Sequence, residues 1–186
     1  MQDHSYSFAI DAPPAELWAA THPPRPPLGP GEVRVIEHGD VRIEILHEGG
    51  AHGDGLVRHC WFRVPKYLLS RGQAQSWEWV TPVVPERSSH YSAIGKPLWS
   101  TAEGWQTFED LGDGRTRVTF RETYHVFNPI LRVLLEKRVH RFISKDNDRM
   151  VKAGLEQALA FHRRGTAPAS GAPAAEAASA AEAASA

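Results

Sequence analysis

The residues best suited to do chemistry lie in the segment 116–126, where polar and apolar side chains alternate. A period of two is typical of a strand that has one face on the core. The more apolar of its two faces holds Val118, Phe120, Glu122, Tyr124 and Val126. A carboxylate among such neighbours is costly unless it has a partner. We therefore expect one of two arrangements: Glu122 and Tyr124 line a cavity and orient a polar group of a ligand, or Glu122 pairs with an arginine such as Arg138.

An arginine in a second predicted strand, residues 56–64, has similar potential. Arg58 shares a strand face with apolar residues that include Phe62, so its side chain is expected to point inward. An inward Arg58 that faces Glu78 or Glu122 forms a buried ion pair, which persists only with supporting hydrogen bonds. Alternatively, its planar guanidinium group grips a carboxylate or an enolate of a ligand.

Tryptophan is concentrated in one part of the chain. Four of the six tryptophans lie between residues 77 and 105, namely Trp77, Trp79, Trp99 and Trp105. Large flat side chains suit a cavity for an aromatic, polyketide or isoprenoid molecule. The alternative is that they fill the core.

Metal and cofactor chemistry have little support in the sequence. The ten histidines are scattered singly and match no zinc-binding spacing. One cysteine, Cys60, excludes an internal disulfide framework, and its neighbour His59 points to the opposite face of a strand. Phosphate-binding and dinucleotide-binding glycine motifs are also missing. We expect neither a metal nor a cofactor, and we expect most of the histidines to be at the surface.

The elements that must position these residues are mostly strands. Turn signals recur at hairpin intervals between residues 32 and 126, which predicts about six antiparallel strands. The Gly-Asp-Gly-Arg sequence at 112–115 is the strongest turn, because Asp-Gly supplies the positive φ of tight hairpins. A further strand is predicted over 5–10, before a short helix that follows Asp11 and ends at Pro23. A proline-rich connector comes next.

A long helix is predicted after the last strand. Asn128 and Pro129 form a helix start, and neither proline nor glycine follows until Gly154. The pattern indicates an amphipathic helix of roughly 30 residues, long enough to cross the sheet. The residues that recur at helical spacing and are expected to face the sheet begin with Leu131, Leu134, Leu135, Arg138 and Phe142.

The last 22 residues, 165–186, have a different composition. Twelve of them are alanine, the hexapeptide AEAASA occurs twice, and no large apolar side chain follows Arg164. Such a segment cannot compensate for the entropy of ordering by burial. We expect one folded domain over 1–164 and a disordered Ala-rich tail over 165–186.

Two segments and their order carry a resemblance to a known family. Residues 8–18, FAIDAPPAELW, and 112–120, GDGRTRVTF, make the chain similar to the SRPBCC or START-like superfamily, the Bet v 1-like helix-grip proteins, and to its polyketide cyclase/dehydrase-like branch. The resemblance covers about residues 5–163. It implies an α+β helix-grip fold, in which a curved antiparallel sheet of six to seven strands wraps around a long C-terminal helix. It also implies short helices after the first strand and an apolar cavity between sheet and helix.

The charge balance narrows the class of partner. The chain has 22 acidic and 21 basic residues, so its net charge of −1 does not favour nucleic acid. No apolar run is long enough to span a bilayer, and no signal pattern is found at the N-terminus, so we expect a cytoplasmic protein without stable membrane insertion. The basic stretch 136–141 is interpreted as a solvated helix face or as a transient contact with anionic lipid.

These observations predict a domain that binds one small hydrophobic molecule, as a carrier or a sensor. The ligand is expected to be a lipid, polyketide, isoprenoid or aromatic compound. A second hypothesis is a cyclase or dehydratase, in which Glu122 or Glu78 transfers a proton while Arg58 and Tyr124 stabilise an enolate. A third is a protein-interaction module that acts through the tail. The predicted cavity residues are Arg58, Phe62, Trp77, Trp79, Trp99, Trp105, Phe120, Glu122, Tyr124, Leu134, Arg138 and Phe142. The oligomeric state is not predicted.

Overall fold

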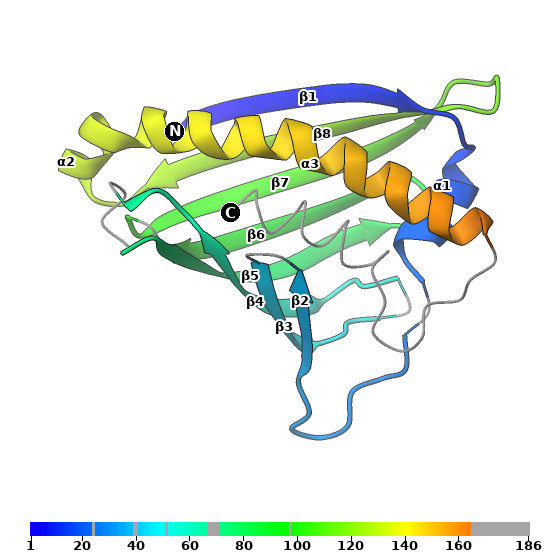
Figure 1. Cartoon of the computed structure of the whole chain (residues 1–186), viewed down its shortest axis with the longest axis horizontal. Helices are drawn as coiled ribbons and strands as arrows, with labels where there is room; N and C mark the ends of the chain where they lie inside the picture. Colours follow the sequence, from blue (N-terminus) through cyan, green and yellow to red (C-terminus); the bar gives the residue numbers. More distant parts are fainter. Residues whose placement is uncertain (24, 39–40, 51, 67–70, 97, 165–186) are drawn as a thin grey trace.

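A curved antiparallel sheet closes around one long helix (Figure 1). The computed structural model describes residues 1–23, 25–38, 41–50, 52–66, 71–96 and 98–164. The predicted Ala-rich tail lies outside the described residues.

The sheet has eight strands in the order β1-β8-β7-β6-β5-β4-β3-β2, and all neighbours are antiparallel. The strands are β1 (Gln2–Ile10), β2 (Arg34–His38), β3 (Val41–His47), β4 (Leu56–Arg63), β5 (Gln73–Val84), β6 (Ser88–Lys96), β7 (Ser100–Asp110) and β8 (Thr116–Val126). The expected α+β helix-grip fold is confirmed, with one strand more than the predicted six to seven. Every connection from β2 to β8 joins sheet neighbours, which is why recurrent turn signals predict this part of the chain well.

Four helical segments complete the chain. They are α1 (Pro14–Thr21), α2 (Pro129–Leu131), η2 (Arg132–Glu136) and α3 (Lys137–Arg163). The predicted cap at Asn128 is confirmed, because its side-chain oxygen accepts hydrogen bonds from the backbone N–H groups of Ile130 and Leu131. The long helix is interrupted at η2, which is a π-helical turn. Such turns shift the positions of the following side chains around the helix.

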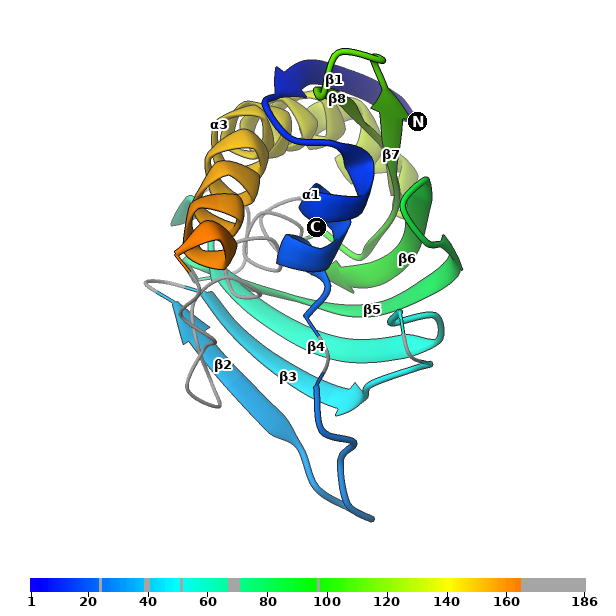
Figure 2. The same cartoon turned by 90° about the vertical axis from the view of Figure 1, so that its right-hand side faces the viewer.

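The concave side of the sheet faces α3 and α1 (Figure 2). Register shifts in β3, between Ile45 and His47, and in β5, between Val80 and Val83, mark β-bulges. A bulge bends a strand and increases its twist, so these positions help the sheet to curve.

The inner face of the sheet and the helices form the core. The alternation of 116–126 predicts its inward face correctly, because the five residues Val118, Phe120, Glu122, Tyr124 and Val126 are all buried. One apolar cluster lies on β3–β8 and the first turns of α3, and a second joins α1 to the far end of α3. Burial of this many apolar side chains is the main stabilising contribution to the fold.

Candidate ligand-binding site

An ion pair lies on the inner face of the sheet, where β4 and β5 are paired. Arg58 stands directly opposite Glu78 in the register, and its Nε and Nη2 both lie 2.7 Å from Glu78 Oε2. Ser76 donates a hydrogen bond of 2.5 Å to the other carboxylate oxygen. Both charged side chains are almost completely buried. The buried pair predicted for Arg58 is therefore confirmed, with Glu78 as a partner.

Glu122 and Tyr124 lie on the same inner face, in β8, and neither is accessible to solvent. The alternative prediction, that Glu122 pairs with Arg138, is wrong, because Arg138 is exposed on α3. Burial raises the pKa of the Tyr124 hydroxyl to about 12, and the neighbouring carboxylates act in the same direction while Ser100 opposes them. Tyr124 therefore stays protonated at neutral pH and can donate a hydrogen bond.

Tyr91 of β6 lies on the same inner face and is not among the predicted cavity residues. Tyr91 is opposite Gly104 in β7, and Gly104 is in turn opposite Glu122 in β8. The ring of Tyr91 lies over Gly104, since a Cβ atom there would be 1.9 Å from the ring carbon Cε1. A glycine inside a predicted strand is a signal for such a close approach.

Two adjoining cavities lead from the surface to this inner face. The outer cleft has a volume of about 420 Å³ and lies between the end of α1, the proline connector and the loop 49–53. The inner cavity, about 80 Å³, reaches Arg58, Val80, Ser89, Gln106 and Leu155 between sheet and helix. The described residues that line both are Thr21, His22, Arg25, His52, Gly53 and Leu56. A ligand-sized space of about 420 Å³ therefore lies at the α1 end of the molecule.

Two arginines contribute the positive charges along this passage, and each lies within 4 Å of a glutamate, Arg58 of Glu78 and Arg25 of Glu48. Arg25, Arg58 and two histidines line the inner cavity, and its described lining contains no aspartate or glutamate. Glu48, at the outer cleft, lies 3.8 Å from Arg25 and also pairs with Arg34. His22 is held in place by stacking on Trp18, with ring centroids 3.8 Å apart. This arrangement favours a ligand with a carboxylate, phenolate or enolate group.

The helix contributes a buried imidazole that the sequence analysis placed at the surface. His140 on α3 is 8% exposed and faces the ring of Tyr124, with centroids 6.4 Å apart. Burial lowers the pKa of His140, and the neighbouring His4 lowers it further. His4 in turn lies 2.6 Å from the carboxylate of Asp148. His140 is therefore neutral at pH 7.

The prediction that tryptophans line the cavity is wrong. Trp77 and Trp79 are 46% and 42% exposed, and Trp99 is 60% exposed. The period of two explains the error for β5, because both residues alternate with the inward Glu78. Trp105 is half-buried and lies beside His90 and Arg121, which places it on the outer face as well.

Two predicted helix residues also point away from the sheet. Leu134 is 63% exposed and Arg138 is exposed, so neither lines the interior. The π-helical turn η2 presents Glu136 inward instead, where its carboxylate accepts a 2.7 Å hydrogen bond from the N–H of Val126. Phe142 is half-buried and packs against the apolar cluster of the inner face.

The remaining predicted residues, Phe62 and Phe120, are buried in that cluster. The structure thus brings Arg58, Phe62, Phe120, Glu122, Tyr124 and Phe142 to the inner side. Of these, Arg58 lines the inner cavity, and Phe62 lines a separate depression over β2–β5.

The outer face carries a separate aromatic row on β4 and β5. The ring of His59 lies between those of Trp61 and Trp77, at centroid distances of 3.8 and 3.9 Å. Burial lowers the pKa of His59. Because Cys60 is buried on the inner side of the same strand, His59 and Cys60 do not form a nucleophile pair.

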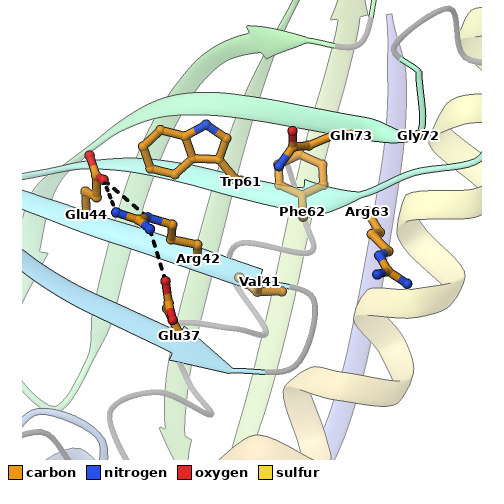
Figure 3. A pocket seen from close by; sticks show the side chains of 9 residues that line it. All are labelled: Glu37, Val41, Arg42, Glu44, Trp61, Phe62, Arg63, Gly72 and Gln73. Atoms are coloured by element: carbon orange, nitrogen blue, oxygen red, sulfur yellow. Dashed lines mark hydrogen bonds and ion pairs between the residues drawn. The ribbon is translucent and has the colours of Figure 1, made fainter.

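A wide depression of about 700 Å³ lies beside this row, over β2–β5 (Figure 3). Three of its charged side chains are paired with each other, because Arg42 contacts Glu37 at 3.1 Å and Glu44 at 2.8 Å. Arg42 also lies over the ring of Trp61, 5.8 Å from its centroid. This depression is a weaker candidate than the cleft at α1, since it is more open to solvent.

No group of three or more His, Cys, Asp or Glu side chains within the described part of the chain is arranged to hold a metal ion. The same part of the chain has no helix long and apolar enough to span a membrane.

Comparison with solved structures decides the fold. The protein TTHA0849 from Thermus thermophilus superimposes with a TM-score of 0.50 at 17% identity, covering 87% of this chain and 99% of that one. The chain has the helix-grip fold. The helix-grip architecture predicted from the sequence is thus confirmed.

Other solved structures have similar shapes at lower scores. Ara h 8.0201 matches with a TM-score of 0.48 and 14% identity, covering 89% of this chain and all of that one. The aromatase/cyclase BexL of the BE-7585A biosynthetic pathway matches with a TM-score of 0.44 and 12% identity, covering 86% of this chain and 44% of that one. No family model matches the sequence, and no curated protein does.

Proposed function

We propose that this helix-grip domain binds one small, mostly apolar molecule with an anionic or enolic group, as a carrier or a sensor. The body of the ligand occupies the outer cleft, and its polar group enters the inner cavity toward Arg58. The observation that carries this proposal is that the outer cleft and the inner cavity share six lining residues, and that the inner cavity reaches the buried Arg58.

The volumes of the two cavities limit the ligand class. Small-molecule sites usually measure about 300–1,000 Å³. The outer cleft, at about 420 Å³, falls in this range, whereas the inner cavity of about 80 Å³ has room only for a small substituent. A compact aromatic, isoprenoid or polyketide acid therefore fits better than a long-chain lipid.

Denaturing extraction of the purified chain followed by mass spectrometry tests the proposal. We expect an apolar acid or phenol in the extract of the wild type, and a clearly lower molar yield from Arg25→Gln, which removes a cation from the passage. Leu56→Trp, which adds bulk where the two cavities meet, should lower the yield in the same way.

Two surface variants serve as controls. Arg42→Gln removes an exposed arginine on the other side of the sheet, and Val33→Trp adds bulk at a position that is 45% exposed. Both should retain the ligand. The proposal fails if no variant changes the amount extracted, or if the wild type yields no small molecule and binds no apolar anion added in its place.

A second candidate function is proton transfer within the same interior. Its basis is the placement of Glu122 beside Tyr124 on one fully buried strand face, with Glu78 already held by Arg58 and Ser76. In a dehydratase, Glu122 would move the proton and Tyr124 would donate a hydrogen bond to the developing oxyanion.

Glu122→Gln distinguishes the enzyme from the carrier. An enzyme of this kind releases a dehydrated compound from the wild type, and from the variant a precursor that is heavier by one water. A carrier releases the same compound from both. The melting temperature of the variant shows whether the chain still folds.

A further inference from the structure

Figure 1 shows α2 at one end of the molecule, and exposed apolar side chains belong to this helix and to neighbouring residues. This group consists of Trp99 (60% exposed), Phe127 (46%), Ile130 (68%), Val133 (84%) and Leu134 (63%), and we call it the apolar tip. A backbone hydrogen bond connects Trp99 to the segment 127–134, because the N–H of Phe127 donates to the carbonyl of Trp99 at 3.0 Å. Exposed apolar residues scattered singly need no explanation, but a group of this kind indicates a contact surface.

A stripe of cations continues from the apolar tip along the helix. The exposed residues of α3 between positions 137 and 145 are Lys137, Arg138, Arg141 and Lys145. Glu136 is the one acidic residue between 129 and 145, and its carboxylate is buried against the N–H of Val126. The positive charge beside the apolar tip is therefore not neutralised by an acidic residue of the same segment.

We propose that the apolar tip and this basic stripe together dock the protein reversibly on an anionic lipid surface. Tryptophan and phenylalanine are suited to the boundary between headgroups and acyl chains, and neighbouring lysines and arginines bind the lipid phosphates. A protein partner that covered the tip would need acidic groups beside an apolar pocket, whereas an anionic bilayer offers both kinds of contact to any such surface.

The docking end lies away from the ligand passage. The tip is at the start of the long helix, while Leu155 of the inner cavity is near the other end of α3. A helix of this length extends about 40 Å. A docked molecule therefore keeps the cleft at α1 directed away from the lipid, so docking brings the protein to a surface without closing its ligand passage.

Co-sedimentation of the full chain with vesicles tests the proposal. We expect binding to phosphatidylcholine vesicles that contain phosphatidylserine, weaker binding to pure phosphatidylcholine, and a loss of binding as salt is added. Val133→Ser/Leu134→Ser changes two strongly exposed side chains, so it should fold normally and lose most of the binding. Lys137→Gln/Arg138→Gln/Arg141→Gln should weaken binding to the anionic vesicles at least about tenfold, since each cation contributes about fivefold.

Matched controls use the same changes elsewhere on the surface. Ile94→Ser removes an exposed apolar residue of the outer sheet face, and Arg117→Gln removes an exposed cation of β8. Both should bind vesicles like the wild type. The proposal is overturned if the wild type does not sediment with anionic vesicles, if the tip and stripe variants bind as well as the controls, or if the tip variants instead abolish a dimer seen by sedimentation velocity.

Discussion

At the scale of single residues, the interior is unusual because it holds charges on a surface that is otherwise apolar. Arg58 and Glu78 are both buried, and Ser76 supplies the third group of the network. Such a pair adds little stability as a whole, but the loss of one partner leaves the other charge buried without compensation.

We predict that Arg58→Met lowers the free energy of unfolding by about 3–5 kcal/mol. Arg58→Met/Glu78→Leu should recover a large part of that loss, because neither charge then remains buried. Urea unfolding followed by circular dichroism measures both. Arg42→Met is the control, and loss of its exposed ion pairs should cost at most about 1 kcal/mol. Equal losses from Arg58→Met and Arg42→Met would contradict the buried network.

His140 makes stability depend on pH. Burial, followed by His4, holds the pKa of His140 below its ordinary value of 6.5, and the nearby carboxylates of Glu136 and Asp3 only partly oppose this. The unfolded chain then binds a proton more readily than the folded chain. Stability is therefore fully present above the ordinary pKa and is lost as the pH falls toward the folded pKa.

We predict that the free energy of unfolding falls as the pH is lowered through the ordinary histidine pKa of 6.5, and that this fall is reduced in His140→Gln. The pKa of His59 is also lowered by burial, so His59 contributes to the same pH dependence. Its contribution remains in His140→Gln. His162→Gln, at an exposed position, should leave the pH profile unchanged. The role assigned to His140 is wrong if the two variants have the same profile.

At the scale of elements, the sequence predicts best where local rules decide the structure. The alternation of β8, the turn at 112–115 and the cap at Asn128 are each set by neighbouring residues, and each is confirmed. The sequence does not determine which face of β5 points inward, because tryptophans on one face compete with Glu78 on the other. The sheet settles this question by pairing Glu78 with Arg58 across the strands.

The sequence also does not determine which residues at the start of the long helix face the sheet. Leu134 and Leu135 are adjacent, so the 3.6-residue period accepts either as the inward residue. The π-helical turn and the hydrogen bond from Val126 to Glu136 select Leu135, which packs on the core while Leu134 is exposed. These contacts connect parts of the chain that no local pattern links.

The close approach of β6 and β7 depends on one missing side chain. A methyl group at position 104 would meet the ring of Tyr91 at 1.9 Å, so we predict that Gly104→Ala lowers stability by about 1–3 kcal/mol. In a Tyr91→Ala background the same change should cost much less, because the ring is gone. Thermal unfolding of the four chains of this cycle measures the difference.

Gly50→Ala is a suitable control, since its new methyl group would have only an ordinary contact at 3.7 Å. Additive effects of Gly104→Ala and Tyr91→Ala would show that the ring does not lie over Gly104.

At the scale of the whole molecule, the predicted tail should be separable from the domain. We predict that truncation after Arg164 changes the free energy of unfolding by no more than about 0.5 kcal/mol. The truncated chain should also bind an apolar anion as the full chain does. Loss of either property would show that 165–186 forms part of the folded unit.

The two ends of the long helix are proposed to have different functions. The apolar tip and basic stripe are proposed to contact lipid, while the cleft beside α1 is proposed to bind a small molecule. The inner charges lie between the ends and are proposed to favour a ligand with an anionic group. The fold alone does not determine the function, so the proposed binding of a small molecule rests on the cleft, the inner cavity and the residues that line them.

A titration of the full chain with anilinonaphthalene sulfonate, an apolar anion, tests the passage most directly. We expect saturable binding of one molecule per chain, followed by fluorescence, with a strong loss of affinity in Leu56→Trp and in Arg25→Gln. Val33→Trp and Arg42→Gln should bind like the wild type. Binding that is absent from the wild type, or that is unchanged in Leu56→Trp and Arg25→Gln, would contradict a ligand site in this cleft.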